Sequence, residues 1–158
     1  MTCRIGPVTV LMVGPAGSGK STYVRKKFPG FVVLNGDSIR HELTGDESNQ
    51  ERNPEVFELL RKRLGDTLMV GESVVIDNTN LQRTHRQNLY QIARKSFSRI
   101  EAHVMPTGRD ECLRRNRMRW RSVPDEVIVS QFEDFLVSLS ELPREPELDA
   151  VVIVGEGA

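Results

Sequence analysis

The sequence contains few cysteines, few aromatic residues and no long hydrophobic run. Its 158 residues include two cysteines, Cys3 and Cys112, and one tryptophan. Two cysteines provide neither a disulfide framework nor the spacing of a metal site, so we expect free thiols in a reducing compartment. No segment reaches the roughly 20 apolar residues of a membrane-spanning helix, and the first apolar run lacks the pattern of a signal peptide. These absences predict a cytoplasmic protein that does not bind a membrane.

A net charge is also absent, because 22 basic residues balance 22 acidic ones. A neutral molecule does not attract nucleic acid through its overall field. The basic residues are nevertheless concentrated in one segment, where only Asp110 and Glu111 oppose them. This segment carries six arginines, namely Arg109, Arg114, Arg115, Arg117, Arg119 and Arg121. Such a block indicates either a site for an anionic ligand or a solvated helix face.

The most specific motif is a glycine-rich run directly after the apolar segment 8–13. Residues 14–21 match G-x-x-x-x-G-K-[ST], the phosphate-binding loop of nucleoside-triphosphate enzymes. The glycines allow consecutive N–H groups to face one concavity, and the dipole of the following helix adds to the field there. Lys20 is expected to reach the β- and γ-phosphates, and Ser21 to bind Mg²⁺. The expected nucleotide ligands are Gly14, Ala16, Gly17, Ser18, Gly19, Lys20, Ser21 and Thr22. The motif therefore predicts binding of ATP or GTP.

Apolar runs and amphipathic segments alternate along the rest of the chain. Strands are predicted at 8–13, 31–35, 73–77, 100–105 and 150–154, and helices at 20–27, 37–43, 54–70, 82–97, 109–119 and from 124 onward. Asp37 or Ser38 is expected to cap the second helix. The last helix is expected to bury one side, formed by Val127, Ile128, Phe132, Phe135 and Leu136. The alternation predicts an α/β fold, a P-loop NTPase with a five-stranded parallel sheet flanked by helices. We expect one domain over 1–158, with a helical lid at about 109–130.

Polar residues follow the second and third predicted strands, at the sheet edge where such folds bind ligands. Asp37 is the candidate base for an acceptor hydroxyl, or a plain helix cap. Arg40, one turn later, would bind an acceptor phosphate or be a surface charge. Asp77 is either a Mg²⁺ carboxylate or a turn residue. Thr79 and Asn80 are candidates for hydrogen bonds to substrate, although such residues are common in turns.

The arginine-rich segment is predicted to form a helix–loop–helix lid over the nucleotide. Arg115 and Arg119 are four residues apart, which places them on one helix face. An arginine of a lid stabilises charge on the transferred phosphoryl group. Trp120 is expected either to stack on a base or to fill a gap under the lid. His41, His85 and His103 do not cluster in the sequence and are given no role.

Four segments taken together resemble the kinase domain of phage-type polynucleotide 5′-kinases. They are residues 14–21, Asn35–Arg40, Val75–Leu81 and the stretch from Arg115 through Pro124, in the same order as in that family. The resemblance implies ATP with Mg²⁺, Lys20 and Ser21 on the phosphates and metal, and Asp37 as general base. It also implies Arg40 and Thr79 on the acceptor phosphate, and Arg119 as the lid arginine supported by Arg115.

This sequence departs from the family at three points. The family often carries a basic residue where Gly36 stands, and its lid is about one residue longer. Bifunctional members add a phosphatase domain with an Asp-x-Asp-x-Thr motif, which this sequence does not contain. These departures concern recognition of the acceptor, whereas the residues expected to bind ATP match the family.

Four functions are compatible with the motifs. The leading one is an ATP-dependent kinase for a hydroxyl of DNA or RNA, most simply the 5′-hydroxyl end. A second is a DNA kinase acting on the hydroxymethyl group of a modified base such as 5-hydroxymethyluracil. A third is a kinase for a sugar or nucleoside, which the zero net charge favours slightly. The fourth, a nucleotide-gated binding module, leaves Asp37 and Arg119 unexplained. No feature points to an obligate protein partner.

Overall fold

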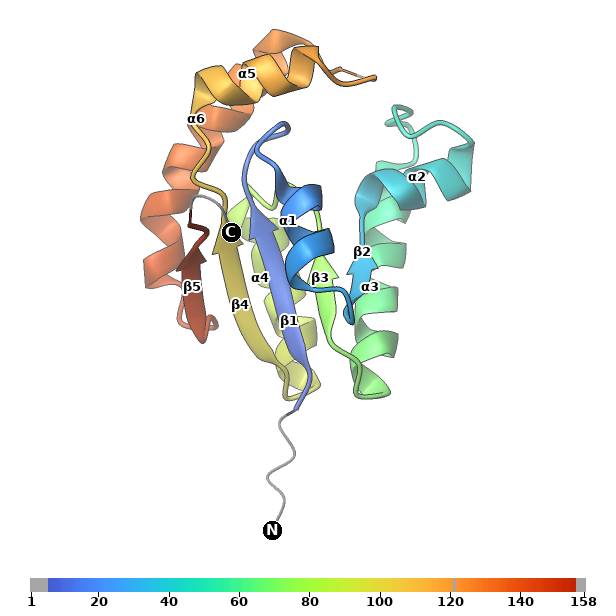
Figure 1. Ribbon diagram of the computed structural model, residues 1–158. Coiled ribbons are helices and arrows are strands. Elements are labelled where there is room, and N and C mark those ends of the chain that lie inside the picture. Colours follow the sequence, from blue (N-terminus) through green and yellow to red (C-terminus); the bar gives the residue numbers. More distant parts are fainter. Residues whose placement is uncertain (1–5, 121, 156–158) are drawn as a thin grey trace.

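A computed structural model describes residues 6–120 and 122–155. Cys3 and Arg121, which the sequence interpretation included, lie outside these residues. Five parallel strands form one sheet in the order β2-β3-β1-β4-β5 (Figure 1). The strands are β1 (Val8–Val13), β2 (Val32–Leu34), β3 (Val74–Ile76), β4 (Arg99–Val104) and β5 (Ala150–Ile153). The predicted P-loop NTPase class of fold is confirmed.

The central strand β1 continues directly into the glycine-rich loop. It pairs with β3 over residues 9–11 and with β4 over its whole length. Residues 9–13 are fully buried because helices cover both faces of the sheet. The loop that follows β1 is therefore held at the middle of the carboxyl edge, where it has neighbours on both sides.

Helices cover both faces and the carboxyl edge of the sheet. They are α1 (Lys20–Lys27), α2 (Gly36–Thr44), α3 (Asn53–Met69), α4 (Arg83–Lys95), α5 (Arg109–Arg117) and α6 (Asp125–Glu141), followed by the 3₁₀ turn η1 (Leu142–Arg144). Figure 1 shows α1 on one face, α3 and α4 on the other, and α5 above the carboxyl edge. No helix among the described residues is both long and apolar enough to span a membrane.

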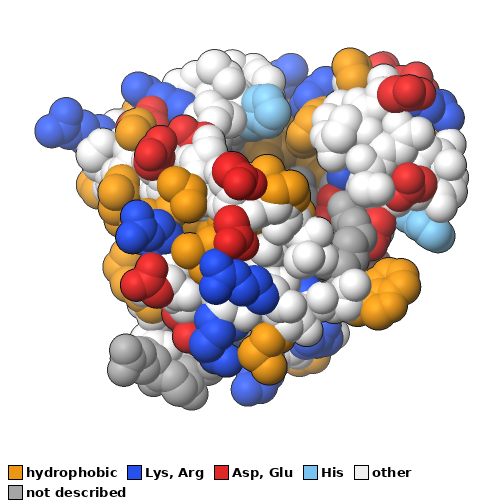
Figure 2. Space-filling model, turned by 90° about the horizontal axis from the view of Figure 1, so that it is seen from above, with side chains coloured by type: hydrophobic (Ala, Val, Ile, Leu, Met, Phe, Trp, Pro, Cys, Tyr) orange, Lys and Arg blue, Asp and Glu red, His pale blue; other side chains and the backbone are white. Residues whose placement is uncertain are grey.

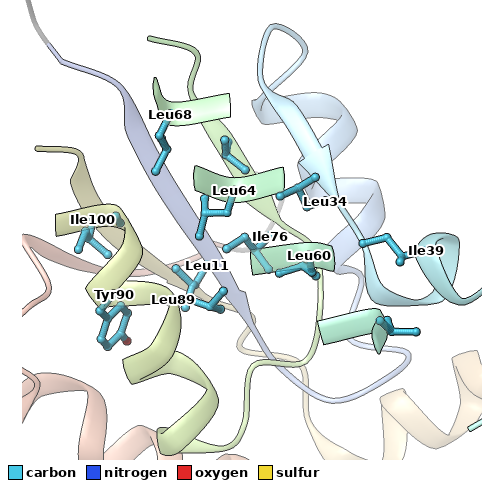
Figure 3. Packing of buried hydrophobic residues seen from close by; sticks show 13 residues of the cluster. Leu11, Leu34, Ile39, Leu60, Leu64, Leu68, Ile76, Leu89, Tyr90 and Ile100 are labelled. Carbon is cyan, nitrogen blue, oxygen red and sulfur yellow. The ribbon is translucent and has the colours of Figure 1, made fainter. Parts of the chain in front are cut away.

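The largest core lies between the sheet and the pair α3 and α4. Leu60, Leu64 and Leu68 recur at helical spacing along α3 and are nearly or fully buried. Figure 3 shows these side chains facing Leu11 and Ile76 of the sheet. This packing fixes the strands relative to α3 and α4, and therefore also positions the loops that follow the strands.

Three details of the helices differ from the prediction. Asn35, not Asp37 or Ser38, caps α2, because the chain turns one residue earlier and the Asn35 side chain accepts a hydrogen bond from Ser38 N. Helix α5 ends at Arg117, two residues before the predicted end. On α6, Ile128 and Phe135 are buried as predicted, whereas Val127 and Leu136 are exposed, contrary to the prediction. The apolar stripe of α6 is thus narrower than predicted.

Candidate active site

Two glycines of the phosphate loop adopt backbone conformations that L side chains rarely adopt. Gly17 has φ +79° and Gly19 has φ +91°. A Cβ at Gly17 would lie 2.6 Å from the carbonyl oxygen of Cys112 in α5. Among the described residues, no hydrogen bond occupies the amide groups of Gly17 and Gly19. The loop therefore presents donors suited to an anion while packing directly against the lid helix.

Gly14 allows close packing for a different reason. A Cβ there would lie 2.8 Å from Ser18 Oγ and 3.2 Å from Met105 Cβ. Ser18 itself is fully buried, and Thr107 Oγ1 donates to its carbonyl oxygen at 2.8 Å. Thr22, in the first turn of α1, is exposed. The loop is thus tied to the segment that leads from β4 into α5.

Lys20 and Ser21 lie at the start of α1 and face the end of β3. Lys20 Nζ donates to Pro15 O at 2.7 Å, and Ser21 Oγ donates to Asp77 Oδ2 at 2.7 Å. Burial lowers the pKa of Lys20 to about 8, although the carboxylate of Asp77 favours the charged amine. Arg119 also lowers this pKa, whereas Asp37 raises it, so both charges act at Lys20. Residues far apart in the sequence therefore share one electrostatic environment.

The hydroxyl of Ser21 and the carboxylate of Asp77 form a pair of oxygen atoms beside the loop. Oxygen ligands of this kind suit Mg²⁺, which usually binds one or two protein groups together with phosphates. Asp77 is buried, with 6% of its surface exposed. Its position beyond β3 fits the sequence prediction of a metal carboxylate.

Asp37 and Arg40 are paired on the first turns of α2. Arg40 Nη1 donates to Asp37 Oδ1 at 2.6 Å, as expected for residues one turn apart. Arg40 is buried and also donates to Asn53 Oδ1 and to the carbonyl oxygen of Glu47. The Asp37 side chain remains half exposed. Arg40 thus fixes the carboxylate and the α2–α3 loop, so it is not the open surface charge of the alternative interpretation.

The segment after β3 is held to its neighbours by amide side chains. Asn78 Oδ1 accepts from Gly36 N at 2.8 Å, and Asn35 Nδ2 donates to Asp77 O at 2.8 Å. Thr79 is half-buried, and its carbonyl oxygen accepts from Gly14 N. These roles of Asn35 and Asn78 were not predicted from the sequence, although an asparagine at the end of a strand is a signal for such bonds.

Asn80 is placed inside this turn. Its backbone has φ +48°, and its buried side-chain amide donates to Met12 O at 2.7 Å and to Ile76 O at 3.2 Å. These bonds give Asn80 a role in the turn. The predicted contact of Asn80 with substrate stays a prediction.

The predicted lid begins with α5, which packs on the phosphate loop. Arg115 Nη1 lies 3.0 Å from the position that a Cβ on Gly19 would take, and Arg115 Nε donates to Glu111 at 2.9 Å. Arg119 lies beyond the end of α5, so the two arginines do not share a helix face as predicted. The side chain of Asn116 bonds both the N–H and the carbonyl of Val123 and closes the intervening loop.

The exposed residues of the lid are informative as well. Trp120 is 98% exposed, so the prediction that it fills a gap under the lid is wrong, and stacking on a base stays a prediction. Arg117 pairs with Asp125, and Arg114 pairs with Glu111. Seen onto the carboxyl edge, the surface is hollowed between two bulges (Figure 2).

The family follows from a match over most of the chain. A family model of AAA domains matches residues 9–142. The chain belongs to that family. The match includes the phosphate loop, Asp37, Asp77 and the lid.

This AAA domain shares its fold with several solved structures, among them two kinases. It superposes on a chain of the Pnkp1/Rnl/Hen1 RNA repair complex with TM-score 0.77 and 21% identity, covering 89% of this chain and 47% of that one. A gluconokinase from Sinorhizobium meliloti 1021 matches with TM-score 0.59 and 21% identity, covering 98% and 86%. The Mycobacterium tuberculosis APS kinase CysC, in complex with AMPPNP and APS, matches with TM-score 0.59 and 18% identity, covering 94% and 88%. The chain spans about half the length of the RNA repair protein.

The predicted resemblance to polynucleotide kinases is therefore supported at the level of the fold. The same fold occurs in kinases of small molecules. At these identities the comparisons leave the acceptor open, and the choice depends on the residues of the site.

Proposed function

We propose that this AAA domain transfers the γ-phosphate of ATP to a hydroxyl group, and that the acceptor is the 5′-hydroxyl end of DNA or RNA. The observation that carries the proposal is the position of Asp37. This carboxylate is half exposed, fixed by Arg40 at 2.6 Å, and close enough to Lys20 to affect its pKa. A base beside a phosphate-binding lysine is the arrangement that phosphoryl transfer to a hydroxyl requires.

Each residue then has a defined part in the transfer. The Asp37 carboxylate accepts the proton of the acceptor hydroxyl while that oxygen bonds to the γ-phosphorus, and the bond from phosphorus to the bridging oxygen breaks to release ADP. Lys20 binds the phosphates, and Arg119 offsets charge that develops on the transferred group. Ser21 and Asp77 would hold Mg²⁺, which, when bound, reduces the negative charge of the phosphates. Arg115 supports the nucleotide side of the lid.

The similarity to a chain of an RNA repair complex and the arginines of the predicted lid support a polynucleotide acceptor. In this interpretation Arg40 and Thr79 bind the phosphate next to the 5′-hydroxyl. Its Nε and Nη1 groups are already bonded, whereas Nη2 makes no hydrogen bond among the described residues and would donate to that phosphate. Gly36 provides no positive charge near Asp37, where the similar kinases often carry a basic residue. The absence of this charge is also compatible with an acceptor that is a hydroxymethyl group on a modified base.

A small-molecule acceptor is the second candidate, favoured by one observation. Arg40 in α2 and Arg52, which directly precedes α3, already bond to carboxylates and backbone carbonyls. A polynucleotide usually recruits several cations for its phosphates, and its binding then depends on salt. A sugar or nucleoside makes no such demand.

The experiment offers γ-labelled ATP with a panel of acceptors. The panel contains 5′-hydroxyl DNA and RNA oligonucleotides, a duplex with 5-hydroxymethyluracil, nucleosides, and sugars including gluconate. We expect label on the 5′ end of an oligonucleotide. Transfer restricted to sugars or nucleosides would overturn the polynucleotide acceptor, and ATP binding without any transfer would favour a nucleotide-gated module.

A further inference from the structure

Gln131, in the middle of α6, makes a direct hydrogen bond to the phosphate loop. Its Oε1 accepts from the backbone N–H of Ala16 at 2.9 Å, and 115 residues separate the two in the sequence. The side chain is half-buried. The motif predicts no partner for the Ala16 amide, so Gln131 has no predicted role. The contact joins the lid side of the site to the loop expected to hold the phosphates.

The same peptide unit is held from its other side by Lys20. The carbonyl of Pro15 and the N–H of Ala16 belong to one peptide group, whose trans planar geometry directs the two in opposite directions. Lys20 Nζ donates to this carbonyl at 2.7 Å. Gln131 and Lys20 therefore bracket a single rigid plane, and rotation of that plane moves the acceptor on which the Lys20 amine rests.

Helix α6 is fixed on both sides of Gln131. Toward its C-terminus, Ser138 Oγ donates to Leu81 O at 2.7 Å and accepts from the buried Arg86 at 3.1 Å. Toward its N-terminus, Asp125 pairs with Arg117 of α5 at 2.7 Å. The carboxamide of Gln131 thus extends from a helix that is anchored to both the sheet edge and the lid. Such a helix can hold the peptide in one orientation.

We propose that Gln131 is a positioning residue that sets the orientation of Lys20 through the Pro15–Ala16 peptide. The inference rests on the proposed function, since it concerns the lysine that would bind the phosphates of ATP. Loss of the Gln131 bond frees the peptide to rotate, so the Lys20 amine loses a fixed acceptor and points less consistently at the phosphates. The lid side of the molecule is then coupled to the phosphate loop through one hydrogen bond.

A double-mutant cycle on ATP affinity tests this coupling. Gln131→Leu removes the acceptor at similar size, and we expect ATP to bind about three- to tenfold more weakly, the usual range for one neutral hydrogen bond. Combined with Lys20→Ala, the Gln131→Leu change is expected to have less than a twofold further effect, because Lys20 is no longer there to be positioned. A merely structural role of Gln131 would give additive losses.

Rescue and control variants complete the test. Gln131→Glu keeps an oxygen acceptor for Ala16 N–H but adds a negative charge beside the loop, so it is expected to recover part of the affinity lost in Gln131→Leu. Gln131→Asn is one methylene shorter and is expected to match Gln131→Leu. Glu133→Ala changes an exposed residue of the same helix and is expected to leave affinity unchanged. The melting temperature is measured for every variant, and Gln131→Asn replaces Gln131→Leu in the cycle if the latter fails to fold.

The outcomes separate this inference from the proposed function. Failure of the unchanged protein to bind ATP would overturn the proposed function. Tight ATP binding by the unchanged protein, with equal affinity in Gln131→Leu or with additive losses in the cycle, would overturn only the positioning role of Gln131.

Discussion

Single residues of the phosphate loop carry constraints that are both conformational and steric. Gly17 needs a positive φ, and its α-carbon approaches the backbone of α5 closely. Lys20 carries an electrostatic constraint, because burial and Arg119 oppose its charge while Asp77 supports it. The motif predicted both residues, but their dependence on α5 and Asp77 arises only from the folded structure.

At Gly17, substitution by alanine is expected to damage both stability and nucleotide binding. The added Cβ would lie 2.6 Å from Cys112 O, and alanine at φ +79° is strained in any surroundings. Together these costs predict a loss of roughly 2 kcal/mol or more in the free energy of unfolding, measured in urea. Gly30→Ala, where nothing lies within 4 Å of the added Cβ, is the control. A Gly17→Ala protein as stable as the control would contradict this account of the loop.

The pKa of Lys20 predicts how ATP affinity depends on pH. In the free protein the Lys20 amine loses its proton as the pH rises through about 8, whereas the phosphates of ATP favour the charged form. Binding above pH 8 therefore requires proton uptake, and affinity is expected to fall as the pH rises, by up to about tenfold per unit. Calorimetry at pH 9 in two buffers of different ionisation enthalpy measures this proton. Affinity that does not change from pH 7 to pH 9.5, or no uptake at pH 9, would contradict the lowered pKa.

Among the elements, apolar runs predicted the strands well because the inner strands β1 and β3 are buried between layers of helices, whereas the edge strands β2 and β5 are exposed in part, at Val33 and Ile153. The β1–loop–α1 unit was predicted to the residue, since the motif marks where strand and helix meet. Helix ends were predicted less well. Asn35 rather than Asp37 caps α2, and its side chain also donates to the carbonyl oxygen of Asp77, which is distant in the sequence. Helix α5 ends at Arg117, and the side chain of Asn116 donates to Val123 O beyond the helix. The hydrophobic pattern predicts neither bond.

The candidate site was predicted in part, for a similar physical reason. The sequence placed Ser21, Asp77, Lys20 and Asp37 at one edge, because parallel strands end together. The bonds of Asn78 to Gly36 and of Gln131 to Ala16 depend on how loops and helices meet in three dimensions. No periodic pattern predicts such contacts.

For the lid, Arg119→Ala is expected to lower the rate more than the affinity for ATP. Arg119 lies beyond α5 on the exposed part of the lid, yet its charge acts at Lys20. A contact made mainly in the transition state predicts a fall of at least about a hundredfold in kcat with little change in the Kd for ATP. Arg109→Ala, an exposed change at the start of α5, is the matched control. An effect confined to ATP affinity would contradict the transition-state role.

The whole molecule has no net charge, so its ability to bind a polyanionic acceptor depends on where its basic side chains lie. Arg40 and Arg52 are already bonded, and so are Arg114, Arg115 and Arg117 of the predicted lid. An extended polyanion would then compete with carboxylates at both places. A small-molecule acceptor would need to fit only into the depression at the carboxyl edge (Figure 2).

Gly36→Lys tests whether a polyanion passes the acceptor side. A Cβ at Gly36 would be 3.4 Å from Asn78 Oδ1, an ordinary contact, so the helix start is expected to tolerate the change. If an oligonucleotide lies there, the added cation lowers its KM and steepens the dependence of binding on salt by up to about one ion. Gly36→Gln, of similar length and no charge, is the control. An unchanged KM and salt slope would place the acceptor elsewhere or make it small.

The role of Asp37 as the base of a phosphotransferase can be tested by comparing the unchanged protein with Asp37→Asn. The unchanged protein and Asp37→Asn are given γ-labelled ATP with the acceptor identified in the panel, and the ATP affinity of both is measured in parallel. The asparagine keeps the size of the side chain and removes its ability to accept the proton. The account predicts that transfer falls by about a hundredfold or more while ATP binding persists. Transfer by Asp37→Asn at the rate of the unchanged protein would contradict it.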